Sequence, residues 1–210
     1  MIYGIVLAAG ASSRMGQAKA ALPFGQTGET VLSRVVSTLF TGGVTGVAVV
    51  AGAHIDAVRQ AMPGDEGRAR VIEHRGWQQG QLSSLLAGLD AIDEPLLEAV
   101  MVTPVDVPLV TPSTVAAVIG AWRRTRAPIV RPADASTSLG AGGQRHGHPV
   151  IFDRAVFADL RAADLNIGAK AVFALHRDWI LNVEVKDAGA FEDIDTPADY
   201  ERLFKGLRSL

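Results

Sequence analysis

The sequence predicts an α/β protein built as a three-layer, doubly wound, mainly parallel sheet with helices on both faces. Short apolar segments rich in β-branched residues alternate along the chain with longer segments whose apolar residues recur at helical spacing. The short segments are almost uninterrupted by polar residues, which is typical of strands buried on both faces. Regular alternation of strand and helix produces right-handed βαβ units and therefore a parallel sheet.

The first expected strand is Ile2–Ala8, an uncharged apolar run that is soon followed by Gly10. Its β-branched residues favour a strand over a short buried helix. Later apolar runs of similar length predict the remaining strands. They are Val44–Val50, Arg70–Glu73, Ala99–Val105, a strand that begins with Ile129–Arg131, His148–Phe152 and Ile180–Val185.

The first expected helix is Thr30–Phe40, which carries apolar residues three and four positions apart and is followed by Gly42 and Gly43. Glycines directly after a periodic segment are typical helix stops. The other expected helices are Asp56–Met62, Leu82–Ile92, Ser113–Trp122, Asp153–Ala162, Ala169–His176 and Pro197–Leu207.

The alternation is interrupted over residues 132–150, where Ser, Thr and Gly are frequent and no periodicity is present. We expect an irregular loop or ribbon there. The length of 210 residues suits one domain, and neither an internal repeat nor a dividing linker is visible. The sequence therefore predicts a single domain over residues 1–210.

Composition excludes several classes of function. A formal net charge of −2 argues against binding to nucleic acid or to an anionic membrane. The absence of cysteine excludes disulfides, thiolate metal sites and cysteine nucleophiles. No apolar run approaches the roughly 18 residues of a membrane span, and the first run lacks the positive flank of a signal peptide. We expect a cytoplasmic protein with no membrane partner.

The loop that follows the first expected strand, from Gly10 to Lys19, has the composition of an anion-binding loop. Its small residues allow backbone N–H groups to approach a phosphate, and Arg14 and Lys19 add positive charge. The loop lacks both the Gly-x-Gly-x-x-Gly pattern of dinucleotide sites and the Lys-Ser/Thr end of a Walker A motif. On residue types alone, a polyphosphate site and a loop with two solvated basic residues remain equally supported.

Two acidic segments contain candidates for a metal site. Asp106 directly follows an apolar strand, where a carboxylate is costly unless it is paired or metal-bound, although a simple turn residue fits as well. Asp193 and Asp195 precede Pro197, so Asp195 or Thr196 could also cap the last helix. Mg²⁺ favours one or two carboxylates together with phosphate oxygens and waters.

The run Leu7-Ala-Ala-Gly-x-Ser-Ser-Arg-Met-Gly-x-x-Lys-x-x-Leu-Pro23 resembles the signature of nucleotidyltransferases related to sugar-nucleotide pyrophosphorylases. Within them, it is most similar to the MobA/MocA-like branch that completes the molybdenum cofactor. The resemblance covers nearly the whole chain and implies a Rossmann-like sheet of the nucleotide-diphospho-sugar transferase type. It also implies one set of nucleotide-binding residues: Leu7, Ala8, Ala9 and Gly10 for base and ribose, and Arg14, Gly16 and Lys19 for the triphosphate.

The same resemblance implies roles for further residues. Asp106 would be the main Mg²⁺ ligand and Asp195, preferred over Asp193, the second. Gly80 and Ser84 match a loop that contacts the base, although His74-Arg75 stand where relatives commonly have Asn-Pro. The family's Gly-His-Pro pattern implies an acceptor site, formed here by Arg145, His146, Gly147 and His148.

His146 and His148 could instead be metal ligands, because residues two apart in a strand share a face. No third ligand stands nearby in the sequence, so a zinc site is disfavoured.

The resemblance therefore implies an enzyme that uses Mg²⁺ to transfer CMP from CTP to the terminal phosphate of a molybdenum-pterin cofactor and releases pyrophosphate. Arg14, Lys19 and Asp106 would be its catalytic residues, and a molybdoenzyme would receive the product. CTP is expected because the guanylyl branch usually has Gly where Ala9 stands.

Three alternatives remain open. The first uses GTP or another NTP and a different phosphorylated acceptor, such as a sugar phosphate. The second is an NAD(P)H-dependent oxidoreductase, which the missing Gly-x-Gly-x-x-Gly disfavours. The third is a non-catalytic cofactor-binding module, which would have no need of two metal-binding acids.

Overall fold

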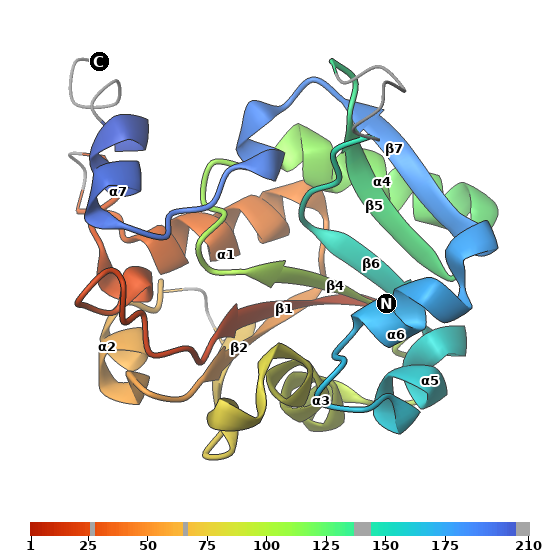
Figure 1. The fold of residues 1–210 in the computed structure, drawn as a ribbon, viewed down its shortest axis with the longest axis horizontal. Helices are drawn as coiled ribbons and strands as arrows, with labels where there is room; N and C mark the ends of the chain where they lie inside the picture. Colours follow the sequence, from red (N-terminus) through yellow and green to blue (C-terminus); the bar gives the residue numbers. More distant parts are fainter. Residues whose placement is uncertain (26–27, 65–66, 137–143, 205–210) are drawn as a thin grey trace.

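A computed structural model describes residues 1–25, 28–64, 67–136 and 144–204. Within these residues, seven strands form one sheet in the order β3-β2-β1-β4-β6-β5-β7 (Figure 1). β6 runs antiparallel to β4 and β5, and the other strand pairs are parallel, which confirms the mainly parallel sheet. The strands are β1 (Ile2–Ala8), β2 (Gly46–Ala51), β3 (Ala69–Glu73), β4 (Ala99–Pro104), β5 (Ile129–Asp134), β6 (Val150–Asp153) and β7 (Ile180–Val185).

Helices cover both faces of this sheet, so the predicted three layers are confirmed. α1 and α4 pack together on one face, and α3, α5 and α6 lie on the other (Figure 1). The helices are α1 (Val31–Gly42), α2 (Ile55–Gln60), α3 (Gln81–Ile92), α4 (Pro112–Thr125), α5 (Phe157–Ala162), α6 (Lys170–Leu175) and α7 (Pro197–Phe204). None of the helices in the described ranges is long and apolar enough to cross a membrane.

Local sequence signals explain where α1 begins and ends. Thr30 accepts a hydrogen bond from the backbone N–H of Ser33 at 3.0 Å, and the Ser33 hydroxyl accepts one from the N–H of Thr30 at 2.8 Å. This reciprocal capping box satisfies two backbone donors that the first helical turn leaves free. Gly43 ends the helix with a φ of 110°, a left-handed conformation that favours glycine.

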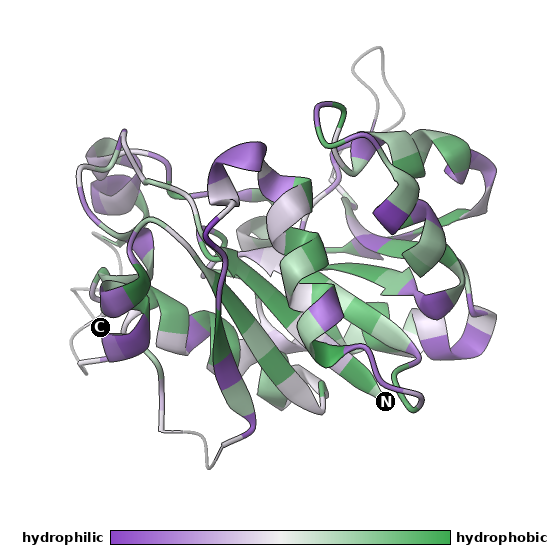
Figure 2. Cartoon of the chain, turned by 90° about the horizontal axis from the view of Figure 1, so that it is seen from below, coloured by the Kyte–Doolittle hydropathy of each residue, from purple (hydrophilic) through white to green (hydrophobic). Residues whose placement is uncertain are grey.

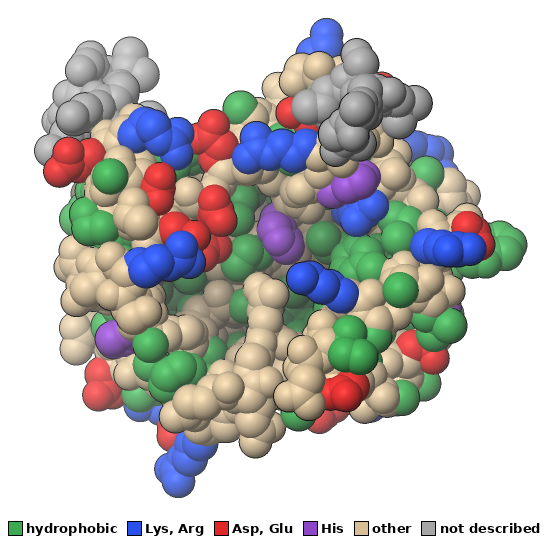
Figure 3. Space-filling model, in the orientation of Figure 1, with side chains coloured by type: hydrophobic (Ala, Val, Ile, Leu, Met, Phe, Trp, Pro, Cys, Tyr) green, Lys and Arg blue, Asp and Glu red, His purple; other side chains and the backbone are tan. Residues whose placement is uncertain are grey.

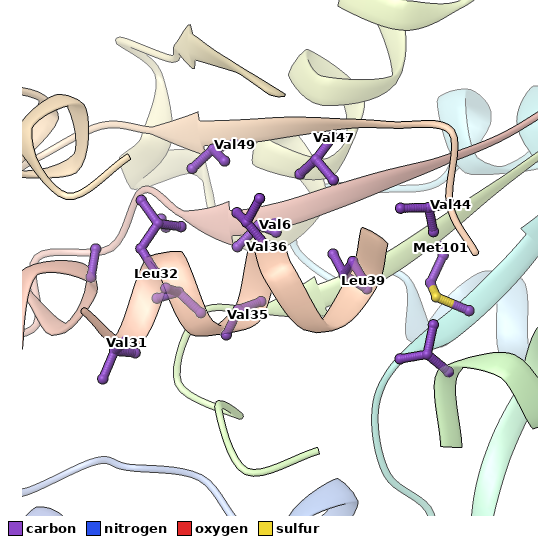
Figure 4. Close-up of a cluster of buried hydrophobic side chains, with 14 of the residues drawn as sticks. Val6, Val31, Leu32, Val35, Val36, Leu39, Val44, Val47, Val49 and Met101 are labelled. Atoms are coloured by element: carbon purple, nitrogen blue, oxygen red, sulfur yellow. The ribbon is translucent and has the colours of Figure 1, made fainter. Parts of the chain in front are cut away.

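The apolar face of α1 packs onto the sheet. Val36 and Leu39 of this helix face Val6 of β1 and Val47 of β2 (Figure 4). The strands are largely hydrophobic and lie between helices whose outer surfaces are more hydrophilic (Figure 2). Burial of each such aliphatic side chain contributes about 1.5–3 kcal/mol, so these contacts hold the sheet and helix in a fixed relation.

The strand register brings several loops to one edge of the sheet. Ala8 at the end of β1 pairs with Ala51 at the end of β2, and Leu7 pairs with Pro104 at the end of β4. These parallel strands therefore finish side by side. The loops that follow their carboxyl ends meet there, which is where open α/β sheets bind ligands.

The structure corrects the prediction for residues 132–150 in part. β5 continues to Asp134, and an isolated bridge joins Ala133 to His146, so this part is more regular than expected. Parallel pairing along β7 gives β5 its backbone partners despite its polar residues. β6 begins at Val150, after Pro149, which has no N–H to donate. The rest of the expected loop, residues 137–143, and the expected end of the last helix lie outside the described residues.

We predict that Leu39→Ala lowers the free energy of unfolding by about 2–5 kcal/mol, because it removes a fully buried side chain and leaves a cavity. Urea denaturation measures this change. The matched control is Leu96→Ala, since Leu96 is 69% exposed, and it should change the stability by less than about 0.5 kcal/mol. Equal losses in the two variants would contradict the assigned core.

Candidate active site

A hollow of about 430 Å³ lies at the carboxyl edge of the sheet, beside the ends of β1 and β4. Basic, acidic and histidine side chains gather around a depression on this face (Figure 3). We call it the nucleotide cleft. Its lining includes every residue of the expected base and ribose site together with most of the expected charged residues. Those are Leu7, Ala8, Ala9, Gly10, Arg14, Lys19, Gly80, Ser84, Asp106 and Asp195.

Lys19 joins the two acidic positions. Its Nζ lies 2.9 Å from Oδ2 of Asp106 and 2.8 Å from Oδ1 of Asp195, although these residues are 87 and 176 positions away in the chain. The Lys19 side chain is only 11% exposed, whereas those of Asp106 and Asp195 are 23% and 27% exposed, so these ion pairs are partly shielded from water. The structure thus brings together a lysine and two acids that the sequence singled out separately.

The ion pairs shift the protonation equilibria of the cluster. Burial alone would lower the pKa of Lys19, but hydrogen bonds to Asp195 and Asp106, together with their negative charges, outweigh it and raise that pKa. The hydrogen bond from Lys19 lowers the pKa of Asp195, with smaller contributions from the charges of Lys19 and Arg14. Lys19 and Asp195 are therefore both held in their charged forms.

Arg14 is the second cation of the cluster. Its Nη2 lies 3.0 Å from Oδ2 of Asp195, and its side chain is 69% exposed. The loop turns sharply here, because Ser12 has a φ of 49° and its carbonyl accepts hydrogen bonds from the N–H groups of Met15 and Gly16. Gly16 shapes this turn with a φ of 75°. It does not line the cleft, whereas Arg14 and Lys19, the other predicted triphosphate-binding residues, do.

Backbone hydrogen bonds hold the acidic loops in place. The N–H of Val105 donates to the carbonyl of Leu7 at 3.1 Å, which extends the pairing of β1 and β4 to the residue before Asp106. The N–H of Ile194 donates to the carbonyl of Asp106 at 2.8 Å. This bond places Asp195, the next residue, beside Asp106. The backbone therefore sets the spacing of the two acids before any side chain contributes.

Two residues that the sequence analysis did not assign to a site, Trp77 and His54, also line the cleft. Trp77 lines the cleft and packs so closely on Gly52 that a Cβ there would lie 2.6 Å from the indole Cγ. His54 also lines it, and its Nε2 lies 2.8 Å from the carbonyl oxygen of Ala11. The position of Trp77 three residues before Gly80 was the available signal for its place in the site.

The four predicted acceptor-binding residues surround a neighbouring hollow of about 410 Å³, which also contains Asp106 and Asp193. Asp193 lines this second hollow and not the nucleotide cleft, whereas Asp195 lines the cleft. Asp195 therefore shares the cleft with Asp106 and Lys19, and its role as the second metal ligand stays a prediction. Gln81, at the start of α3, lines both hollows, so they adjoin each other.

The acids of the cleft fit a divalent cation that is shared with a phosphorylated ligand. Asp106 and Asp195 direct oxygens at one point, where the charged amine of Lys19 lies. In the described part of the chain, no three His, Asp or Glu side chains cluster as a complete protein-built metal site. Mg²⁺ commonly takes one or two carboxylates and completes its shell with phosphate oxygens and waters, which suits this pair.

Fold and cleft together define an α/β protein with a ligand site at the carboxyl edge of its sheet. The site is large enough for a nucleotide and is lined in part by basic side chains. Residues 4–180 match the MobA-like NTP transferase domain, and the chain belongs to this family. A seven-stranded sheet of this type matches the structures of nucleotide-diphospho-sugar transferase-like proteins.

The individual proteins to which the chain is similar are named for different activities. The chain is 28% identical over 204 residues to nicotine blue oxidoreductase of Paenarthrobacter nicotinovorans, with 96% of each chain covered. It is 33% identical over 161 residues to a probable molybdenum cofactor guanylyltransferase of Mycobacterium avium, covering 77% of this chain and 78% of the relative. The crystal structure of Rv0371c from Mycobacterium tuberculosis superposes with a TM-score of 0.78 at 29% identity and covers 98% of each chain. The same protein has been solved with manganese, with a TM-score of 0.69 at 28% identity and coverage of 97% of this chain and 98% of that one.

We predict that Gly147→Ala destabilises the protein by about 1–3 kcal/mol, because a Cβ at this position would lie 2.0 Å from the carbonyl oxygen of Ala190. Separation of these two segments would also disturb the acceptor hollow. Thermal unfolding measures the loss. Gly64→Ala is the matched control, since its Cβ would meet nothing within 4 Å. Equal melting temperatures for both variants would refute the close packing at Gly147.

Proposed function

We propose that this chain transfers a nucleoside monophosphate from an NTP to a phosphorylated acceptor and releases pyrophosphate. Its preferred substrates are CTP and the terminal phosphate of a molybdenum-pterin cofactor, and a molybdoenzyme would receive the product. The observation that carries the proposal is the contact of Lys19 with both Asp106 and Asp195 at the mouth of the β1 loop. The relative from Mycobacterium avium supports the acceptor, because its name is that of a molybdenum cofactor enzyme.

The arrangement suits a reaction that depends on alignment and charge. The base and ribose would lie against residues 7–10, Gly80 and Ser84, which all line the cleft. Lys19 and Arg14 would then bind the β- and γ-phosphates and stabilise the charge that builds on the leaving pyrophosphate. Nucleotidyl transfer of this kind is catalysed mainly by positioning and by charge neutralisation.

Asp106 and Asp195 would hold Mg²⁺ or a similar divalent cation, which supplies charge neutralisation on phosphate oxygens when bound. The manganese complex of the Mycobacterium tuberculosis relative supports such a cation. Asp106 lines both the nucleotide cleft and the acceptor hollow, so it stands where the two substrates would meet.

The reaction needs no general base from the protein. The attacking group is a phosphate monoester whose second pKa is about 6, so it is already largely ionised at neutral pH. Arg145 and His146 line the acceptor hollow and would bind this phosphate. Burial, followed by the charge of Arg131, lowers the pKa of His146, so His146 would act as a neutral hydrogen-bonding group.

A second candidate function is oxidoreduction. Its support is the relative named nicotine blue oxidoreductase, which matches 96% of this chain. In that case a nicotinamide nucleotide would occupy the nucleotide cleft. Oxidation of NAD(P)H without pyrophosphate release would identify this activity, whereas nucleotidyl transfer releases pyrophosphate and leaves NAD(P)H unchanged.

We predict that Asp106→Asn and Lys19→Met each reduce pyrophosphate release by about 10²–10³-fold, because each removes a charge from the reacting centre. The assay contains CTP, Mg²⁺ and molybdenum-loaded pterin, and circular dichroism verifies that the variants fold. Asp56→Asn is the control, since its side chain is 84% exposed and does not line the cleft. Wild-type turnover in either cleft variant would refute the role of that residue.

We also predict that CTP gives a larger kcat/KM than GTP, because Ala9 stands where guanylyl relatives usually have Gly. The extra methyl group would narrow the part of the cleft that takes the base. A panel of four NTPs with the same acceptor measures this preference, and Ala9→Gly should shift it toward GTP. A wild-type preference for GTP would contradict the assignment of CTP while leaving the reaction type intact.

A further inference from the structure

A third hollow, of about 500 Å³, extends from the acceptor hollow toward α6. We call it the inner cavity. Gln81, His146, Gly147 and His148 line both, so a single molecule could have its phosphate beside Asp106 and its remaining part in the inner cavity. Its walls are largely apolar and aromatic. They include Leu7, Leu82, Leu85, Val102, Val150, Phe152 and Phe173.

Arg131 and Lys170 are the basic side chains in these walls, and Arg131 is the one that contacts Phe173. Its Nε donates a hydrogen bond to Oδ1 of Asn182 at 2.9 Å, and its guanidinium lies 5.5 Å from the centre of the Phe173 ring. Within the described residues, no carboxylate forms an ion pair with it, and burial lowers its pKa without any acidic neighbour to oppose the shift. The terminal amino groups of a half-buried guanidinium therefore remain available to an anion.

His148 provides a second polar group without a partner. Its ring forms a hydrogen bond with the backbone of Val102, while its Nδ1 is buried and has no partner in the described part of the chain. Burial also lowers the pKa of His148 and keeps the ring neutral. Buried polar atoms of this kind are usually satisfied, so an unpaired Nδ1 beside a cavity indicates a missing hydrogen-bond donor.

The walls discriminate between classes of ligand. A sugar carries hydroxyl groups all around its ring, and those that face the Leu, Val and Phe side chains would have no hydrogen-bond partners. A planar unsaturated ring would instead pack against Phe173, whose ring already forms an edge-to-face pair with Phe152 at 5.7 Å.

We propose that Arg131 recognises an acidic group on the acceptor, distinct from the reacting phosphate, and that this group is carried by a planar unsaturated ring that packs against Phe173. The acceptor thus has two separated anionic groups, one beside Asp106 and one beside Arg131. This assignment rests on the proposed function, because only that function makes the bound molecule an acceptor. Occupation of the inner cavity by a planar acid does not depend on that function.

The first test uses calorimetric titration of the full chain with three probes, without NTP or metal. The probes are 2-naphthoate, which has a ring and an acid, 2-naphthol, which has the ring alone, and gluconate, which has an acid on a polyol. We expect 2-naphthoate to bind at least about tenfold more tightly than either other probe, because only it satisfies both the walls and Arg131. Binding of gluconate or 2-naphthol as tight as that of 2-naphthoate, or no measurable binding of 2-naphthoate, would overturn the proposal.

The second test assigns the binding to Arg131. Arg131→Met keeps an unbranched stem beside Phe173 but removes the charge, and should weaken 2-naphthoate binding at least fivefold while leaving 2-naphthol binding unchanged. Phe173→Leu should weaken both. The matched control is Arg68→Met, because the Arg68 guanidinium also lies over a phenylalanine ring, 4.3 Å from the centre of Phe40, and does not line the inner cavity. A smaller change in Arg131→Met than fivefold would overturn the assignment.

A kinetic measurement separates this proposal from the proposed function. If the chain transfers nucleotides, Arg131→Met should raise KM for the acceptor and leave KM for the NTP unchanged. An unchanged acceptor KM would overturn the role of Arg131. If no pyrophosphate is released but 2-naphthoate still binds through Arg131, the proposed function fails and the ligand assignment of the inner cavity stands.

Discussion

The ion pairs of Lys19 with Asp106 and Asp195 are the interaction on which the rest of the site depends. Two carboxylates this close repel each other in a partly buried setting unless a cation lies between them. Lys19 supplies that cation from the loop after β1, and Arg14 adds a second positive charge at Asp195. Two negatively charged side chains thus face two positively charged ones, so their charges cancel without a ligand.

This balance explains how a substrate would enter. A triphosphate would compete with the carboxylates for Lys19 and Arg14, because its oxygens are stronger partners than those of a single acid. The carboxylate oxygens released in this way would then be free for a divalent cation. Binding of nucleotide and binding of metal would therefore favour each other, and the resting ion pairs would protect an otherwise repulsive pair of acids.

The sheet provides the geometry that side chains alone could not provide. β1 and β4 end in register, and one backbone hydrogen bond from Ile194 to Asp106 attaches the last acidic loop to the edge of the sheet. A close approach of Gly147 to Ala190 brings the acceptor segment to this loop, and a close approach of Gly189 to Leu109 joins the same part of the chain to the segment after β4. The three hollows are neighbours that share lining residues such as Gln81.

Much of this arrangement could be predicted from the sequence. β1 has the predicted bounds because an uncharged β-branched run favours a buried strand. Lys19 stood out because it lies in the loop after this strand, and Asp106 because it directly follows another apolar strand. The contact between Lys19 and the acids could not be predicted, because it joins residues far apart in the chain. β5 was underestimated because Arg131 and Asp134 interrupt its apolar pattern, although β7 supplies its pairing. Trp77 could not be assigned to the cleft from the sequence, because a single tryptophan gives no indication of which cavity it borders.

The most direct measurement of the central claim is a crystal structure with a non-hydrolysable CTP analogue and Mn²⁺, in which anomalous scattering locates the metal. The account predicts a manganese peak bound by Asp106 and Asp195, with the triphosphate on the loop that contains Arg14 and Lys19. A peak away from both aspartates, or phosphates that avoid that loop, would contradict it.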